Sequence, residues 1–380
     1  MNILMINLPF SGHTNPTLPL TAELVKRGHH VAYINAEPFR KSIEESGAHF
    51  VPYSDFPANP TEQDKKKLSF TAAFRTAMNM KEQFDLLIYE MFFYPGIEIS
   101  KRKGIPCVRQ FSQPAWSEKT WDVAPFIFRT SAKLIDMQVL PKRTAQALGL
   151  EYTCLRDGII KSKPDLNIVY VPEAFQLRRK SFGEDYIFRV PEAKAVKGEI
   201  TIPYEEMKAP VVYISLGSII SDKGFCKKCI KAFGNKNYSV ILNTGKVSPK
   251  SLGNIPKNIY AYSFVPQIEV LTHTDVFLTH CGMNSINEAL TLGVPMVAMP
   301  FMNDQLTNAK RIVQLGIGRQ IRSIPSSSNE MYEAVKTVYT EKSFKQNAVK
   351  MQNIIRRQIS WDCVIGRIEQ LVENRHEELI

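Results

Sequence analysis

The sequence predicts an α/β protein with two doubly wound parallel sheets, one after the other along the chain. The 380 residues exceed what one ordinary hydrophobic core holds, so two domains are expected. Residues 1–35 and 211–300 both alternate apolar, strand-like runs with helix-like segments, as parallel sheets covered by helices do. Between them, residues 190–210 combine three prolines with mixed charge and no periodicity, which is typical of a linker.

The first 35 residues predict a strand–helix–strand unit. Residues 3–8, ILMINL, form the apolar run that a strand buried on both faces requires. Asn15 followed by Pro16 fits a helix N-cap with proline at the first helical position, and Gly28 fits the C-terminal end of that helix. Residues 30–35, HVAYIN, then form a second strand, parallel to the first.

The same alternation continues through both halves. In the first half we expect strands at 84–90, 105–111 and 166–172, a helix at 94–104, and helical or irregular chain at 112–163. In the second half we expect strands at 211–218, 238–245, 259–266, 276–282 and 294–300, and helices at 224–234, 284–293 and after 327. Ligands of such sheets bind beyond the carboxyl ends of the strands. Two sheets in tandem are therefore expected to present a cleft between two rows of strand-end turns.

Composition and charge restrict the class of protein. With 44% hydrophobic and 22% charged residues the chain is typical of globular proteins, and no apolar run reaches the roughly 18 residues of a membrane span. The start, MNILMINL, lacks the basic region of a signal peptide, so we expect a cytoplasmic protein. The net charge of +11 could favour anionic partners, but it is spread over short clusters among acids, as on a solvated surface. No basic stripe interleaves with aromatics, so nucleic acid is not expected as a partner.

The six cysteines are expected to be free thiols, since the sequence shows no export signal. Cys226 and Cys229 have the CxxC spacing, but no second pair completes a zinc site. They fall in a helix-like segment and do not follow a strand, so neither metal nor redox chemistry is expected there.

One turn in the second half has the residues of a phosphate site. Gly282, Asn284 and Ser285 open a helix directly after a strand, where the first backbone N–H groups lack partners within the helix and attract anions. His280, at the end of the strand, could donate to a pyrophosphate oxygen. Glu288, one helical turn later, could accept from ribose hydroxyls. For each residue alone, helix capping is the alternative.

The continuous block from Tyr262 to Arg311 resembles the donor-binding signature of UDP-glycosyltransferases of the GT-B fold. The first half resembles the bacterial macrolide- and flavonoid-glucosylating branch of that family through FSGHTNPTLPL (10–20) and DLLIYE (85–90). The resemblance covers essentially the whole chain. It implies two Rossmann-like domains facing across a cleft: an acceptor-binding domain (1–198), a linker (199–209) and a donor-binding domain (210–360). The last helix, 361–380, is expected to pack back on the first domain.

The resemblance also implies which residues bind the donor. Phe264 stands where many relatives have a tryptophan that stacks on the uracil ring. The Val265 backbone and Gln267 would complete the base pocket. For Phe264, packing in the core is the alternative. Asp304 and Gln305 correspond to the pair that binds sugar hydroxyls, unless they form an ordinary polar loop. The expected donor-binding residues are Gly12, Ser218, Phe264, Val265, Gln267, His280, Gly282, Asn284, Ser285, Glu288, Asp304 and Gln305.

His13 and Glu90 are the expected catalytic pair. His13 occupies the turn after the first strand, where the resemblance implies a general base that takes the proton of the acceptor hydroxyl. Glu90 ends a strand where the family has an aspartate, and it would hold the other imidazole nitrogen. Glutamate is one methylene longer, which puts the geometry of the pair in question. The expected reaction inverts the configuration at the anomeric carbon of the sugar and needs no cofactor. No metal is expected either, since no DxD-type triplet ends a strand.

The acceptor is expected to be an apolar, hydroxyl-bearing small molecule such as a macrolide, polyketide or flavonoid, and the donor a UDP-hexose, most simply UDP-glucose. The candidates for the acceptor pocket are the aromatic residues Phe10, Phe92, Phe111 and Trp116, although some of these rings could belong to the core.

Other functions stay open at this point. A lipid-acceptor glycosyltransferase at a membrane surface would use the positive charge, a sugar-nucleotide epimerase could share the fold, and an inactive relative could serve as a scaffold for another protein. A dinucleotide-dependent dehydrogenase is disfavoured, because residues 8–16 contain one glycine where its fingerprint needs three.

Overall fold

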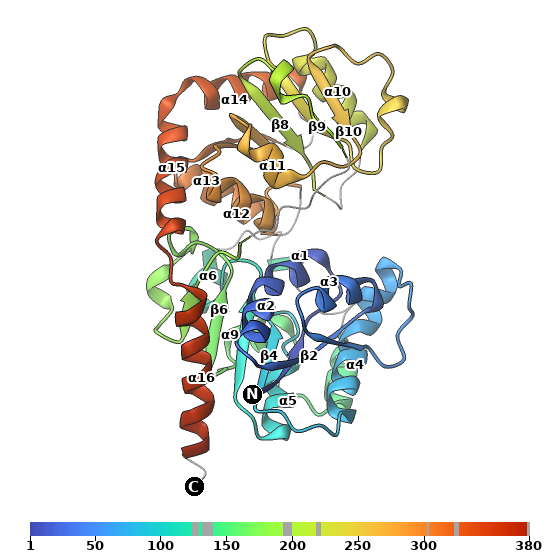
Figure 1. Cartoon of the computed structure of the whole chain (residues 1–380), viewed down its shortest axis with the longest axis vertical. Helices are drawn as coiled ribbons and strands as arrows, with labels where there is room; N and C mark the ends of the chain where they lie inside the picture. Colours follow the sequence, from blue (N-terminus) through green and yellow to red (C-terminus); the bar gives the residue numbers. More distant parts are fainter. Residues whose placement is uncertain are drawn as a thin grey trace. The chain divides into compact units, whose positions relative to one another are not determined.

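The computed structural model describes residues 1–123, 129–130, 140–192, 200–217, 222–301, 304–322 and 327–377. The chain divides into two compact units. The first comprises Met1–Glu192 and Gln358–Ile380, and the second comprises Ala193–Arg357 (Figure 1).

The first unit is built on a seven-stranded parallel sheet. In sheet order its strands are β3 (His49–Pro52), β2 (His30–Asn35), β1 (Asn2–Ile6), β4 (Leu86–Glu90), β5 (Cys107–Phe111), β6 (Leu166–Val169) and β7 (Tyr186–Phe188). Its helices are α1 (Ser11–Thr14), α2 (Leu18–Lys26), α3 (Arg40–Glu44), α4 (Glu62–Asn79), α5 (Gly96–Lys103), α6 (Glu118–Val123), α8 (Lys142–Ala147), α9 (Leu155–Ile160) and α16 (Trp361–Glu377).

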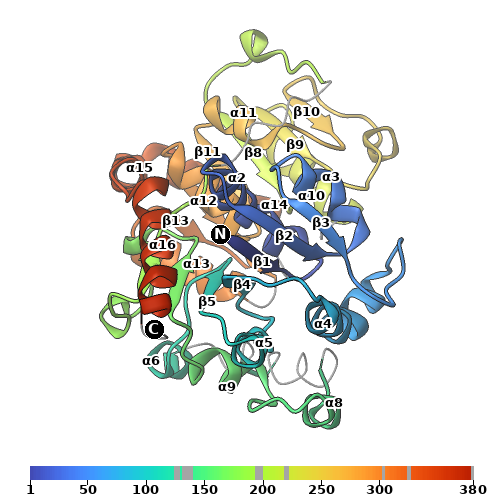
Figure 2. The ribbon, with the colours of Figure 1, turned by 60° about the horizontal axis from the view of Figure 1, so that its bottom comes forward.

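Helices cover both faces of this sheet, which explains its continuous apolar strands. Leu20 and Leu24 of α2 and Ile365 of α16 share one core cluster with inward-facing strand residues. On the opposite face, α5 lies so close to β4 that a side chain on Gly96 would collide with the Tyr89 ring. Figure 2 shows α4 and α5 together on that side, with α2 on the other. The expected buried strand at the start of the chain is confirmed.

The chain between β1 and α2 differs from the prediction. We expected Asn15 to cap a helix that starts at Pro16, but helical chain already begins at Ser11 as the short helix α1. Asn15 lies in a following 3-10 turn (Asn15–Thr17), whose tight geometry accommodates Pro16, and its side chain caps nothing. The predicted end of the helix is confirmed, since Gly28 follows α2 with a φ of +89°.

The second unit is built on a six-stranded parallel sheet. In sheet order its strands are β10 (Ile259–Tyr262), β9 (Ser239–Asn243), β8 (Val211–Ser215), β11 (Val276–Thr279), β12 (Met296–Ala298) and β13 (Gly318–Gln320). Its helices are α10 (Lys223–Phe233), α11 (Gln267–Thr272), α12 (Met283–Thr291), α13 (Asp304–Gln314), α14 (Ser328–Thr340) and α15 (Lys342–Arg356). Tyr204, in the segment expected to be a linker, stacks on His273 of this unit with 3.8 Å between ring centroids.

The CxxC pair lies in the core of the second unit. Cys226 and Cys229 are both buried on the inner face of α10, within the cluster that packs this helix on the sheet. Burial raises the pKa of the Cys226 thiol to about 11 and raises that of Cys229 as well. All six cysteines are free thiols. These two therefore act as small apolar residues.

The C-terminal part of the chain returns to the first unit through polar contacts beside the last strand of its sheet. The Gln358 amide exchanges two hydrogen bonds of 2.9 Å with the backbone of Val190. The indole N–H of Trp361 donates to Glu192 at 2.6 Å. From there α16 runs along α2, and its apolar face joins the core (Figure 1). None of the helices described is long and apolar enough to pass through a membrane.

Candidate active site

His13 and Glu90 come together at the carboxyl edge of the first sheet. His13 lies in α1 directly after β1, and Glu90 is the last residue of β4. These strands are neighbours, and the strand order changes direction between them, which is where open α/β sheets bind ligands. His13 Nδ1 lies 3.0 Å from Glu90 Oε1. The histidine side chain is 24% exposed and the glutamate is fully buried.

Two asparagines at the same edge fix the backbone that carries His13. The Asn7 amide donates to the His13 carbonyl at 3.0 Å, and the Asn35 amide donates to the Thr14 hydroxyl at 3.0 Å. Both asparagines are fully buried at the ends of β1 and β2. Sequence reasoning missed them. The available signal was a polar residue at the end of an otherwise apolar strand.

Aromatic rings line up beside His13. The rings of Phe10 and Phe92 both contact the imidazole, with centroid distances of 5.5 and 5.2 Å. Phe92 packs edge-on against Trp116. Three of the four expected acceptor residues are thus connected to His13. The fourth, Phe111, is fully buried and packs against Arg109 and Tyr186, so its ring belongs to the core.

In the second unit, His280 lies between two glycines. It follows β11, next to β8, and the strand order again reverses between these two strands. A Cβ on Gly217, which has a φ of +73°, would lie 2.6 Å from the imidazole, and one on Gly282 would lie 2.5 Å from it. Both residues must therefore lack a side chain for the ring to hold this place.

Burial keeps His280 neutral. Desolvation lowers its pKa to about 4, against a smaller opposing effect of the Ser215 backbone. A neutral imidazole retains one N–H donor. Directly beyond it, α12 begins with Gly282 as its N-cap, and no side chain caps the helix. Its first N–H groups, including those of Asn284 and Ser285, can therefore serve an anion.

Glu288 is part of a hydrogen-bonded group further along α12. The Gln267 amide donates to the Glu288 carboxylate at 2.5 Å and to the Ser285 hydroxyl at 3.1 Å. The Gln267 Oε1 accepts from the hydroxyl of Tyr213 at 2.9 Å. The amide of Gln267, which we expected to complete the base pocket, thus also contacts the residue expected to bind the ribose. Burial raises the pKa of Glu288, and the bond from Gln267 partly offsets this.

Asp304 and Gln305 begin α13 and make local contacts. Gln305 accepts from the backbone N–H of Phe301 at 2.9 Å. Asn308, a buried residue that sequence reasoning missed, donates to Asp304 at 3.2 Å and to the Cys281 carbonyl at 3.0 Å. This amide links the start of α13 to the turn after β11.

The remaining expected donor residues differ in exposure. Phe264 is 53% exposed, so the alternative of core packing is wrong for this ring. Val265 beside it is buried. A side chain on Gly12 would meet nothing within 4 Å, so the chain there is open to a ligand. Ser218 lies outside the described residues.

Comparison with known proteins identifies the family. Residues 204–359 match the family model described as UDP-glucoronosyl and UDP-glucosyl transferase. The NDP-glycosyltransferase YjiC of Bacillus licheniformis is 31% identical over 355 residues, which cover 88% of each chain. The chain belongs to the UDP-glycosyltransferase family.

Two further relatives extend the similarity of this glycosyltransferase over its whole length. Oleandomycin glycosyltransferase of Streptomyces antibioticus is 26% identical and covers 99% of this chain, with 92% of its own length matched. The solved structure of the glycotransferase of kitacinnamycin has a TM-score of 0.82 and 25% identity, covering 97% of this chain and 98% of that chain. The predicted GT-B fold, with two Rossmann-like parallel-sheet domains, is therefore confirmed.

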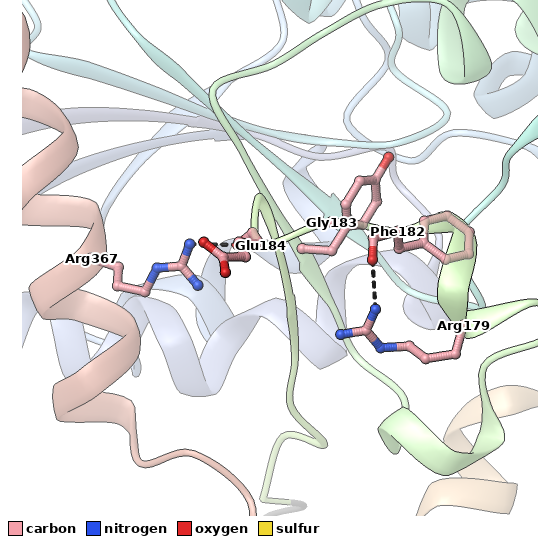
Figure 3. Close-up of a pocket in the computed structure, with 6 residues that line it drawn as sticks. Arg179, Phe182, Gly183, Glu184 and Arg367 are labelled. Atoms are coloured by element: carbon pink, nitrogen blue, oxygen red, sulfur yellow. Dashed lines mark hydrogen bonds between the residues drawn. The ribbon is translucent and has the colours of Figure 1, made fainter.

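A pocket of about 570 Å³ in the first unit of the glycosyltransferase contains none of these site residues. It is lined by Arg179, Phe182, Gly183, Glu184, Tyr186 and Arg367. The two arginines donate to the backbone carbonyls of Phe182, at 2.7 Å, and Glu184, at 2.5 Å (Figure 3). These bonds join the loop before β7 to itself and to α16, so the pocket is explained by packing of the C-terminal helix.

Proposed function

We propose that this glycosyltransferase moves a hexose, most simply glucose, from a UDP-sugar to a hydroxyl of an apolar small molecule, with inversion and without a metal. The observation that carries the proposal is the 3.0 Å contact between His13 Nδ1 and Glu90 Oε1. A buried carboxylate beside one nitrogen of a partly exposed imidazole is the arrangement of a general base with its orienting partner.

The proton transfer follows from that arrangement. A carboxylate can only accept, so Glu90 beside Nδ1 favours the tautomer with the proton on Nδ1 and the lone pair on Nε2. Nε2 takes the proton of the acceptor hydroxyl while its oxygen attacks the anomeric carbon. The bond from that carbon to the diphosphate oxygen breaks on the opposite side, and the configuration at the anomeric carbon is inverted. The imidazolium formed is stabilised by the ion pair with Glu90.

The second unit would hold the donor. The negative charge of the departing diphosphate would be met by the N–H groups at the start of α12 and by the neutral His280. Glu288 would accept from the ribose and the exposed Phe264 would stack on the base. Asp304 and Gln305 would bind the sugar hydroxyls once they turn from their present local partners.

The class of acceptor rests on two observations. Phe10, Phe92 and Trp116 place apolar surface next to His13. Oleandomycin glycosyltransferase is named for oleandomycin as its acceptor, and this relative matches the chain over nearly its full length. An apolar, hydroxylated natural product therefore fits the site best.

The test is a matrix of UDP- and TDP-sugars against macrolide, polyketide and flavonoid acceptors, with products identified by mass spectrometry. NMR of the anomeric proton then gives the configuration of the new bond. The proposal predicts a β-linked hexoside from an α-linked UDP-hexose, formed in the presence of a chelator. A retained configuration, or conversion of the UDP-sugar without any acceptor, would contradict it.

A further inference from the structure

The hydroxyl of Tyr213 is linked through Gln267 to Glu288, the residue expected to bind the ribose. The proposed reaction assigns this hydroxyl no role. Tyr213 is the third residue of β8, and its side chain is fully buried. Its ring stacks on Phe277 of the neighbouring strand β11, with centroids 4.8 Å apart and planes 11° apart. The ring position is therefore set by core packing, while its hydroxyl contacts Gln267 at the start of α11.

That hydroxyl determines how the Gln267 amide is used. Tyr213 donates to Oε1 at 2.9 Å, so both N–H bonds of the amide point the other way. They donate to Ser285 and to one oxygen of Glu288. A carboxylate accepts and cannot donate, so the reverse orientation of the amide would set two oxygens against each other. Every donor of the Gln267 side chain is thus committed to the two residues of α12.

Burial keeps the phenol of Tyr213 protonated. Desolvation raises its pKa far above the ordinary value, so the hydroxyl remains a hydrogen-bond donor at neutral pH. Among the residues that the structure describes, Gln267 is the one that donates to the Glu288 carboxylate. The second oxygen of Glu288 can therefore accept from a ligand.

We propose that Tyr213 is a positioning residue for the donor nucleotide: through Gln267 it holds the Glu288 carboxylate in the orientation that reads ribose hydroxyls. The inference rests on the proposed role of the second unit in binding the nucleotide. It assigns selection of ribose over deoxyribose nucleotides to a chain of three side chains from β8, α11 and α12, of which Tyr213, buried in the core, touches no substrate.

The test compares two nucleotides that differ only in the ribose hydroxyls. Calorimetry gives the affinities of the full-length protein for UDP and for 2′,3′-dideoxy-UDP. A hydrogen bond to a charged group predicts that wild-type protein prefers UDP by about 10-fold or more. In Tyr213→Phe, which keeps the ring stacked on Phe277, we expect the preference to fall about 5-fold, through weaker binding of UDP and unchanged binding of the dideoxy nucleotide.

Three further variants make the result decisive. Gln267→Met removes the connecting amide at a half-buried site, and it should lower the preference as Tyr213→Phe does, with no further loss in the double variant. Tyr238→Phe, a tyrosine that packs against Phe233 and Tyr332 in the same unit, should leave the preference unchanged. A wild-type preference in both Tyr213→Phe and Gln267→Met would overturn the inference.

Glu288→Gln separates this inference from the proposal on which it rests. If Glu288→Gln loses the preference for UDP while Tyr213→Phe and Gln267→Met keep it, the ribose is read by Glu288 and the positioning role of Tyr213 is wrong. If Glu288→Gln itself keeps the preference, the assignment of Glu288 to the ribose is wrong, and the inference is overturned with it.

Discussion

The Glu90 carboxylate reaches within 3.0 Å of the His13 imidazole, although its side chain is one methylene longer than the aspartate of the family pattern. The longer side chain fits because Glu90 is the last residue of β4 and is buried beneath α1, whose backbone is held by the amide of Asn7. The departure from the pattern thus preserves the pairing of imidazole and carboxylate.

This pairing predicts the behaviour of variants at position 90. Glu90→Gln should lower kcat roughly 10²- to 10⁴-fold, because the imidazolium loses its counter-charge. Glu90→Asp should lower kcat less, since aspartate keeps the negative charge but its shorter side chain lies further from the imidazole. Thermal unfolding is the control: glutamine has the shape of glutamate and leaves no unpaired charge beside a neutral imidazole, so Tm of Glu90→Gln should change little. Full turnover in Glu90→Gln would show that the carboxylate has no part in catalysis.

The glycines around His280 predict a steric effect on donor binding. In Gly282→Ala the new methyl group would lie 2.5 Å from the imidazole, so the ring must move. We expect UDP affinity to fall about tenfold or more, as for a lost charge-assisted hydrogen bond. Gly366→Ala is the matched control, since a methyl group there meets nothing within 4 Å. Equal UDP affinities in both variants would argue against a phosphate site beside His280.

The exposure of Phe264 predicts that its role is in binding and not in stability. Phe264→Ala should leave Tm within about 1–2 °C of wild type, because the ring is 53% exposed. UDP affinity should fall by roughly 5- to 100-fold, the range for stacking of a base on an aromatic ring. Phe264→Trp should bind UDP at least as tightly as wild type. A large drop in Tm with unchanged UDP affinity would assign the ring to packing after all.

The low pKa of His280 predicts a distinctive titration. With histidines labelled by ¹³C, the His280 signal, assigned by its loss in His280→Gln, should not shift between pH 8 and pH 5, because the pKa is about 4. The unfolded chain has the ordinary pKa near 6.5 and takes up a proton first as pH falls. His280 therefore destabilises the folded state progressively from about pH 6.5 down to 4, and has no such effect above that range. A midpoint near 6.5 would contradict the buried, neutral state.

The sequence was sufficient for the elements whose signal is local. The apolar runs that became β1, β8 and β11 needed two covered faces, and Gly28 needed a positive φ, so both features were visible in the residues themselves. The short strand β13 was not predicted, because two of its three residues are exposed and its pairing with β12 comes from the sheet.

The candidate residues of the site could be proposed from the sequence, but the buried residues that support them could not. His13 and Glu90 could be placed together because neighbouring parallel strands end at one edge. Asn7, Tyr213 and Asn308 were missed, since a buried polar residue on an apolar strand or helix gives no sign of its partner in sequence. The contact of Gln267 with Glu288 was not predicted either, because it depends on how α11 meets α12, which only the tertiary structure determines.

The central claim, that His13 takes a proton from the acceptor, is tested most directly by His13→Ala with acceptors of graded acidity. The rate of the chemical step is measured in single turnovers with saturating UDP-hexose. If His13 is the base, the variant should lose about 10²- to 10⁴-fold with an ordinary alcohol and progressively less as the hydroxyl becomes a more acidic phenol. A loss of the same size for every acceptor, or near-normal turnover with the alcohol, would contradict it.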